Sequence, residues 1–159
     1  MPITETMFGP KKYLTLRKSI AISQVSDKDM YDQAGKKLGS YMQAHGIVPS
    51  GPWSVIYFTW DQAAGKTDLG IAFPVDNLEG IEDPELSVVE IPECKAAMDV
   101  LHGSYEGLTT IHQGLMQYTQ EKGYNGHGLS AMAVEEYVVD PMQEPNPDSW
   151  VTNIYYLHN

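Results

Sequence analysis

The sequence predicts an α+β fold in which a β-α-β-β unit occurs twice, with antiparallel sheets, two long helices and a cleft between the repeats. Three observations support this fold class. Two amphipathic segments lie 77 residues apart, each is followed by two strand-like segments that form a hairpin, and an acidic segment separates the two copies. The 159 residues suffice for one domain with its own core.

The two helices are predicted from matching apolar stripes. The first stripe consists of Tyr31, Ala34, Leu38 and Tyr41, followed by Gly46. The second consists of Leu108, Ile111, Leu115 and Tyr118, followed by Gly123. Spacings of three and four residues place each set on one helix face, and a glycine just past the end favours a left-handed cap. Ser26 with Asp29 predicts an N-terminal capping box for the first helix.

Strands are predicted around each helix because these segments are rich in β-branched and aromatic residues. They cover residues 12–23, 53–60 and 68–75 in the first copy, and 86–102, 129–139 and 150–157 in the second. Within residues 53–60, one face carries Trp53, Val55 and Tyr57, and the other carries Ile56, Phe58 and Trp60. Since both faces are apolar, we expect this strand to be covered on both sides.

These segments define a single domain over residues 1–159. Repeat one covers about residues 11–76, an acidic linker about 77–85, and repeat two about 86–159.

The composition excludes several classes of function. Twenty-one acidic and 10 basic residues give a net charge of −11, so the molecule repels nucleic-acid phosphates and anionic lipid head groups. Cys94 is the only cysteine, which excludes an internal disulfide framework and fits a reducing compartment. No apolar run reaches the ~20 residues of a membrane span. We therefore expect a cytoplasmic protein without direct nucleic-acid or membrane partners.

Neither a metal site nor a cofactor is expected. The five histidines, His45, His102, His112, His127 and His158, lack the i, i+4 pairing of a helical zinc motif, and surface or capping roles are favoured for most of them. No serine or cysteine has the sequence context of an acyl-transfer nucleophile. Acyl-transfer catalysis therefore has no support in the sequence.

Two adjacent carboxylates, Glu135 and Glu136, interrupt an otherwise apolar segment. Successive strand residues face opposite sides, so Glu135 and Tyr137 share a face and Glu136 points the other way. Burying an unpaired carboxylate costs several kcal/mol unless a partner compensates. In one interpretation Glu135 is the counter-charge for a ligand, and in the other both glutamates lie at an exposed sheet edge. Both interpretations stay open because one sequence does not fix the strand register.

The aromatic residues on the predicted strands favour the ligand-binding interpretation. Aromatic faces and one carboxylate together form a pocket suited to a lipophilic cation. The candidate ligand-binding residues are Glu135, Tyr137, Tyr57, Trp53, Trp60, Tyr105 and Tyr155. The same aromatic side chains also suit an ordinary core.

Several segments in a fixed order resemble the GyrI-like small-molecule-binding family, also described as the AraC-type effector-binding domain. They are Gly51-Pro52, residues 68–75, residues 102–108 with their Gly-x-Tyr and following acidic residue, Glu135-Glu136-Tyr137, Asp140-Pro141 and residues 150–154. The resemblance extends over about residues 12–157. It implies a duplicated β-α-β-β fold with a ligand cleft between the repeats, and it implies that Glu135 is the pocket carboxylate.

Many relatives carry this module behind a helix-turn-helix domain in transcription regulators of drug response. Here about ten residues precede the first predicted strand. We therefore expect a stand-alone module without direct contact with DNA. Tyr156 stands where proline is common in the family, and this departure leaves the ligand's identity open.

Three functions follow, in order of preference. The first is a module that senses or sequesters a lipophilic small molecule, with a cation as one option, in an aromatic pocket with a central carboxylate. The second, implied by resemblance to hydrolases of cyclopropane-containing compounds, is hydrolysis of a strained electrophile, in which Glu135 directs water and Tyr137 or Tyr57 orients the substrate. The third is binding of a protein partner through the acidic surface, as in a relative named for inhibiting DNA gyrase.

Overall fold

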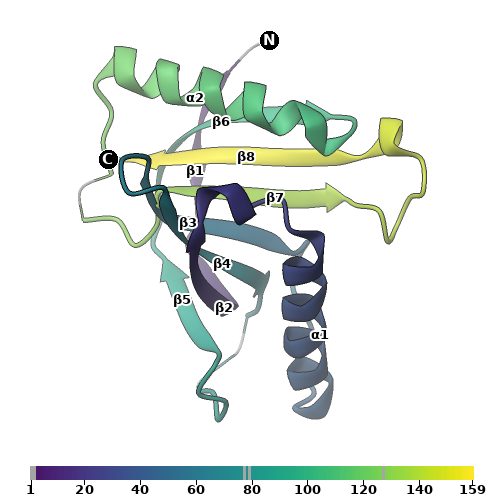
Figure 1. The fold of residues 1–159 in the computed structure, drawn as a ribbon. Coiled ribbons are helices and arrows are strands. Elements are labelled where there is room, and N and C mark those ends of the chain that lie inside the picture. Colours follow the sequence, from purple (N-terminus) through teal and green to yellow (C-terminus); the bar gives the residue numbers. More distant parts are fainter. Residues whose placement is uncertain (1–2, 77, 79, 127) are drawn as a thin grey trace.

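A computed structural model of the chain describes residues 3–76, 78, 80–126 and 128–159. Its strands are β1 (Thr4–Phe8), β2 (Lys11–Ala21), β3 (Ser54–Asp61), β4 (Lys66–Pro74), β5 (Ser87–Ile91), β6 (Cys94–His102), β7 (Ala133–Val139) and β8 (Val151–His158). Its helices are α1 (Lys28–Ala44) and α2 (Leu108–Lys122), with short 3₁₀ helices η1 (Ile22–Gln24), η2 (Tyr105–Gly107) and η3 (Pro147–Ser149). The fold shown in Figure 1 is α+β, as predicted.

The strands form one curled sheet in the order β1-β6-β8-β7-β3-β4-β2-β5, and every pairing is antiparallel (Figure 1). Two groups of strands, β2-β4-β3 and β6-β8-β7, meet at the β3–β7 pair. Helix α1 contacts β2 and β4, and helix α2 contacts β6 and β8. Each helix therefore packs on its own group of strands, and the predicted duplicated unit is present.

Two strands extend these units beyond the prediction. Strand β1 lies in N-terminal residues for which no strand was expected, and β5 and β6 divide the predicted segment 86–102. Strand β1 pairs with β6, and β5 pairs with β2. Strand β1 thus adds an edge strand to the second copy, and β5 adds one to the first. These pairings join the two copies at both ends of the sheet as well as at its centre.

The helix ends agree with the prediction at the C-terminal side and differ at the N-terminal side. The Asp27 side chain caps α1 by accepting hydrogen bonds from the backbone N–H groups of Asp29 and Met30, at 3.1 and 3.4 Å. The predicted capping box of Ser26 and Asp29 is therefore wrong, because the next residue supplies an equally suitable acceptor. After the helices, Gly46 and Gly123 have the expected positive φ, 65° and 69°.

Both faces of the sheet carry a buried core. The face covered by α1 and α2 is called the helix face here, and its buried strand residues include Leu14, Val55, Tyr57, Leu69, Ile71, Ala97, Leu101, Ala133, Tyr137, Ile154 and Tyr156. The opposite face buries Phe8, Tyr13, Ile56, Ala72, Val89, Ile91, Cys94, Ala96, Ala131, Val134 and Leu157. Strand β3 is covered on both sides, as predicted. Neither helix in the described part of the chain is long and apolar enough to cross a membrane.

Candidate ligand-binding site at Glu135

Glu135 lies on the helix face, where the two copies of the unit meet. Its strand, β7, is an interior strand between β8 and β3, and the Glu135 residue is only 2% exposed. The alternative of an exposed sheet edge therefore does not hold. Glu136 points to the opposite face, where its carboxylate accepts hydrogen bonds from Lys11 Nζ at 3.2 Å and Asn153 Nδ2 at 3.0 Å. The two adjacent carboxylates thus have separate environments, as strand alternation predicts.

Two tyrosines donate hydrogen bonds to the same oxygen of Glu135. The hydroxyl of Tyr137 lies 2.6 Å from Oε1, and the hydroxyl of Tyr57 lies 3.4 Å from it. The strand register explains this convergence, because Val55 on β3 is the partner of Glu135 on β7. Each of these two residues is followed two positions later by a tyrosine. Since the strands run antiparallel, the two phenols reach the carboxylate from opposite sides.

The second oxygen of Glu135 pairs with a histidine from helix α2. His112 Nε2 lies 2.5 Å from Glu135 Oε2, and His112 Nδ1 lies 2.7 Å from the hydroxyl of Tyr156 on β8. The His112 side chain is 22% exposed, whereas the Glu135 side chain is 2% exposed. Both carboxylate oxygens are therefore engaged by protein groups, and His112 is the more accessible partner.

The phenols around Glu135 remain protonated over the neutral pH range. Burial, followed by the negative charge of Glu135, raises the pKa of Tyr57 and of Tyr137 well above the usual value for tyrosine. The pKa values of Tyr156 and Tyr31 are raised in the same direction by the same two causes. All four phenols therefore add no competing negative charge, and Tyr57 and Tyr137 act as neutral hydrogen-bond donors to Glu135.

Aromatic rings continue from Tyr137 away from the carboxylate. The ring of Trp53 stacks on Tyr137 at 4.2 Å between centroids, and its Nε1 donates to Asp140 Oδ2 at 2.9 Å. Tyr105 meets Tyr137 edge-on at 5.5 Å and stacks on Trp150 at 5.0 Å. Its buried hydroxyl has no hydrogen-bond partner among the described residues, and burial raises the pKa of Tyr105 to about 12. These four rings, Trp53, Tyr105, Tyr137 and Trp150, are called the aromatic wall below.

The structure does not bring every candidate residue to Glu135. Trp60 contacts Tyr57 edge-on at 5.9 Å and lies at the margin of the site. It packs against the helix-face core, not on the face predicted for it, because the β3–β4 register shifts between Tyr57 and Thr59. Tyr155 lies on the opposite face, where it contacts Phe8 at 4.8 Å. Its neighbour Tyr156 takes the place near the carboxylate.

Sequence reasoning missed His112, Tyr156 and Tyr31. His112 was counted among histidines with surface or capping roles, although it follows Ile111 and lies four residues after Leu108 on the predicted apolar stripe. Its place on this stripe was the one signal in the sequence that His112 faces the interior of the protein. Tyr31 was assigned only to packing, yet it reaches the site from α1, with its ring 6.4 Å from that of Trp53. His127 lies outside the described residues.

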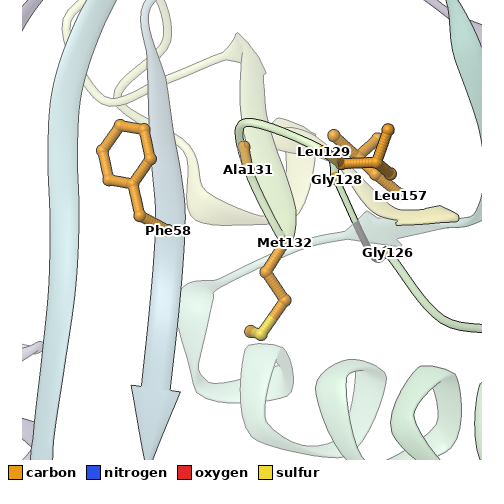
Figure 2. Close-up of a pocket in the computed structure, with 7 residues that line it drawn as sticks. All are labelled: Phe58, Gly126, Gly128, Leu129, Ala131, Met132 and Leu157. Carbon is orange, nitrogen blue, oxygen red and sulfur yellow. The ribbon is translucent and has the colours of Figure 1, made fainter.

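A separate hollow of about 340 Å³ lies between β3 and the segment before β7 (Figure 2). Its lining consists of Phe58, Gly126, Gly128, Leu129, Ala131, Met132 and Leu157. None of these side chains is titratable, so the hollow offers no charge to a ligand. Among the described residues, no group of three or more His, Cys, Asp or Glu side chains is placed to hold a metal ion.

The comparison with protein families matches this chain over residues 1–158 to the model of the GyrI-like small molecule binding domain. The comparison with curated proteins gives no match. Among solved structures, the EcmrR C-terminal domain is 18% identical with a TM-score of 0.79, covering 100% of this chain and 99% of that one. This chain spans 57% of the EcmrR chain in a complex with DNA.

Two further structures have the same fold. SAV2435 bound to tetraphenylphosphonium is 11% identical with a TM-score of 0.71, covering 100% of this chain and 94% of that one. A hydrolase encoded by lin2189 from Listeria innocua is 12% identical with a TM-score of 0.55, covering 97% and 90%. At these identities the likeness establishes the fold, and the chemistry of each site has to be argued from its own residues.

Proposed function

We propose that this chain, which belongs to the family of GyrI-like small molecule binding domains, binds a lipophilic organic cation. Glu135 would hold the positive charge of that ligand. The observation that carries this proposal is a carboxylate buried to 2% exposure at the junction of the two copies. Among the described residues, no lysine or arginine forms an ion pair with it. A buried carboxylate without a permanent cation is costly, so a ligand cation would gain a strong partner there.

The surroundings of Glu135 suit a large apolar ligand. The aromatic wall offers ring faces that attract a cation and bury hydrocarbon at the same time. The hydroxyl of Tyr105, which has no hydrogen-bond partner among the described residues, provides a further polar group for a ligand. Ligand-binding roles are therefore proposed for Glu135, Tyr57, Tyr137, Trp53 and Tyr105, with Trp60 as a marginal contact.

The comparisons support this choice of ligand class. Tetraphenylphosphonium, which is bound in the SAV2435 structure, is a cation enclosed by four phenyl rings. It combines a positive charge, which Glu135 favours, with apolar aromatic rings, which the aromatic wall favours. The same binding event would serve sensing where the domain belongs to a regulator, as in the EcmrR–DNA complex, or sequestration where it acts by itself.

Tetraphenylphosphonium and tetraphenylborate provide the sharpest test, because the two ions share a shape and have opposite charges. We expect the phosphonium to quench tryptophan fluorescence saturably and the borate to bind at least tenfold more weakly. Glu135→Gln should weaken phosphonium binding by about tenfold or more, roughly 1.4 kcal/mol. Glu136→Gln is the matched control, since it removes a charge from the opposite face. Equal affinity in the wild type and Glu135→Gln would refute the proposal.

A second candidate function is hydrolysis of a strained electrophile. The observation that favours it is the short contact between His112 and Glu135, because a histidine–carboxylate pair is suited to moving a proton to or from water. A solved structure of a hydrolase with the same fold is consistent with it. Product formed in excess over protein from a cyclopropane-containing substrate would favour hydrolysis, whereas stoichiometric binding without product would favour the binding module.

A further inference from the structure

His112 occupies the position at Glu135 that a ligand cation needs. Its Nε2 contacts Glu135 Oε2, while Oε1 is already engaged by Tyr137 and Tyr57. The tyrosines are neutral donors held by two interior strands, so they do not compete as charges. The histidine is the one partner of this carboxylate, among the described residues, that carries a positive charge when it is protonated.

We propose that His112 is an internal counter-ion of Glu135, which a bound cation displaces with release of the imidazolium proton. The proposal rests on the function proposed above. In the ligand-free protein, protonated His112 donates from Nε2 to the Glu135 carboxylate and from Nδ1 to the Tyr156 oxygen. On binding, the ligand cation takes the place beside Oε2, the N–H bond of the imidazolium breaks, and the proton passes to solvent. The neutral imidazole then has no charge to compete with the ligand.

The placement of His112 permits this displacement. Its side chain is 22% exposed, so it lies between the buried carboxylate and solvent and has space outside the core. Its ring meets Tyr57 only by an edge, at 5.9 Å between centroids. A buried residue such as Tyr137 could not leave without opening the core, so His112 is the partner that a ligand replaces at least cost.

The internal repeat indicates that this histidine is not required for helix packing. The position 77 residues earlier, in α1, is Gly35, and its surroundings contain no atom within 4 Å of an added Cβ. The neighbouring core positions do match, because Ala34 corresponds to Ile111 and Leu38 to Leu115, and all four are buried. Only one copy of the unit therefore places an ionisable group here, and that copy also supplies Glu135.

Several other titratable groups surround His112 and belong in any pH analysis. Glu135 on β7, Tyr156 on β8 and Tyr57 on β3 contact it directly. Asp99 on β6 is buried under α2 and accepts a hydrogen bond from the backbone N–H of Val100. Tyr105 and the exposed Glu106 belong to η2, which packs against the start of α2. Of these groups, only His112 brings a positive charge to Glu135.

The wild-type protein alone provides the first test. Isothermal titration calorimetry with tetraphenylphosphonium at pH 6, 7 and 8, in two buffers of different ionisation enthalpy at each pH, measures the protons released per ligand. We expect the release of up to one proton per bound ligand at one or more of these pH values. Wherever protons are released, the affinity should rise with pH, by at most about tenfold per pH unit. Binding without proton release at all three pH values would overturn the proposal.

Variants at His112 provide the second test. His112→Asn and His112→Gln should bind tetraphenylphosphonium more tightly than the wild type at pH 5.5, by about tenfold, with little dependence on pH. His45→Asn is the matched control, because His45 stacks on Tyr41 at the end of α1 and does not contact Glu135. It should retain the wild-type pH dependence.

The outcomes separate this proposal from the function on which it rests. Wild type and His112 variants that bind equally, with the same pH dependence, would overturn the counter-ion role and leave cation binding intact. Weaker binding by folded His112 variants would also overturn it, since His112 would then be a ligand contact. Binding only in the His112 variants would support displacement. Absence of binding in every protein would refute the proposed function and this inference together.

Discussion

At the scale of single residues, the site depends on which groups around Glu135 carry charge. The carboxylate is buried, and the phenols of Tyr57 and Tyr137 donate to it without being charged. Burial and the nearby carboxylate both disfavour the ionised phenolate, so the raised pKa of each tyrosine has a clear cause. The two phenols therefore contribute neutral donors to the site, and His112 is the one partner of Glu135, among the described residues, that brings a positive charge when protonated.

The raised pKa of Tyr137 predicts a loss of stability at high pH. An unfolded tyrosine releases its proton near pH 10, whereas Tyr137 in the folded protein keeps it to higher pH. The unfolded state therefore binds fewer protons above about pH 10, and the free energy of unfolding falls as the pH rises. Thermal unfolding followed from about pH 8 to 11 should show a smaller decline in Tm for Tyr137→Phe than for the wild type. The variant is also expected to be less stable at pH 8, so the informative quantity is the slope; equal slopes would contradict the account.

The residue-scale site was partly predictable from the sequence. Strand alternation alone placed Glu135 with Tyr137 and turned Glu136 to the other face. The convergence of Tyr57 on the same oxygen needed the β3–β7 register, which pairs residues about 80 positions apart and leaves no local signal. Tyr155 was predicted to lie in the site instead of Tyr156, so the face of strand β8 that points toward Glu135 was misassigned by one residue. His112 was missed because a histidine on an apolar stripe carries no distinctive signal until its partner is known.

At the scale of elements, the helices and the central strands follow from local patterns. Residues at spacings of three and four identified α1 and α2, and their C-terminal glycines are left-handed as expected. Strand β1 was missed because the segment Thr4–Phe8 is short and pairs with β6, some 90 residues away. Trp60 lies on a different face than predicted because of a register shift in β3–β4 that the residue types do not indicate. Local sequence patterns therefore predict most helices and strands. The departures from the prediction, strand β1 and the face of Trp60, depend on pairings between distant segments.

One glycine within α2 and one just past its end should respond oppositely to replacement by alanine. Gly123 has a φ of 69°, a conformation that costs an L-residue about 1 kcal/mol or more, so Gly123→Ala should destabilise the protein. Gly114 lies within the helix with no atom within 4 Å of an added Cβ, so Gly114→Ala should stabilise it by roughly 0.5–1 kcal/mol. Urea denaturation measures both changes in the free energy of unfolding. A shift of both variants in the same direction would contradict this account of the helix end.

At the scale of the whole molecule, the two copies of the unit are joined so that one charged site lies between them. The β3–β7 pair is the central junction, and the exchanged strands β1 and β5 close the two ends. Helix α1 brings Tyr31 and helix α2 brings His112 toward the same carboxylate. The net charge of −11 adds a field that attracts cations to the molecule as a whole. In the proposed function, the specificity for a ligand depends on the aromatic wall and on the exchange of His112 for the ligand cation.

A crystal structure of the protein with tetraphenylphosphonium at pH 8 would show whether Glu135 holds the cation. We expect the phosphonium on the helix face, with its phenyl rings against Trp53 and Tyr137, its charge directed at Glu135, and the His112 ring moved away from Oε2. A phosphonium seated in the hollow around Phe58, with the His112–Glu135 contact intact, would contradict it.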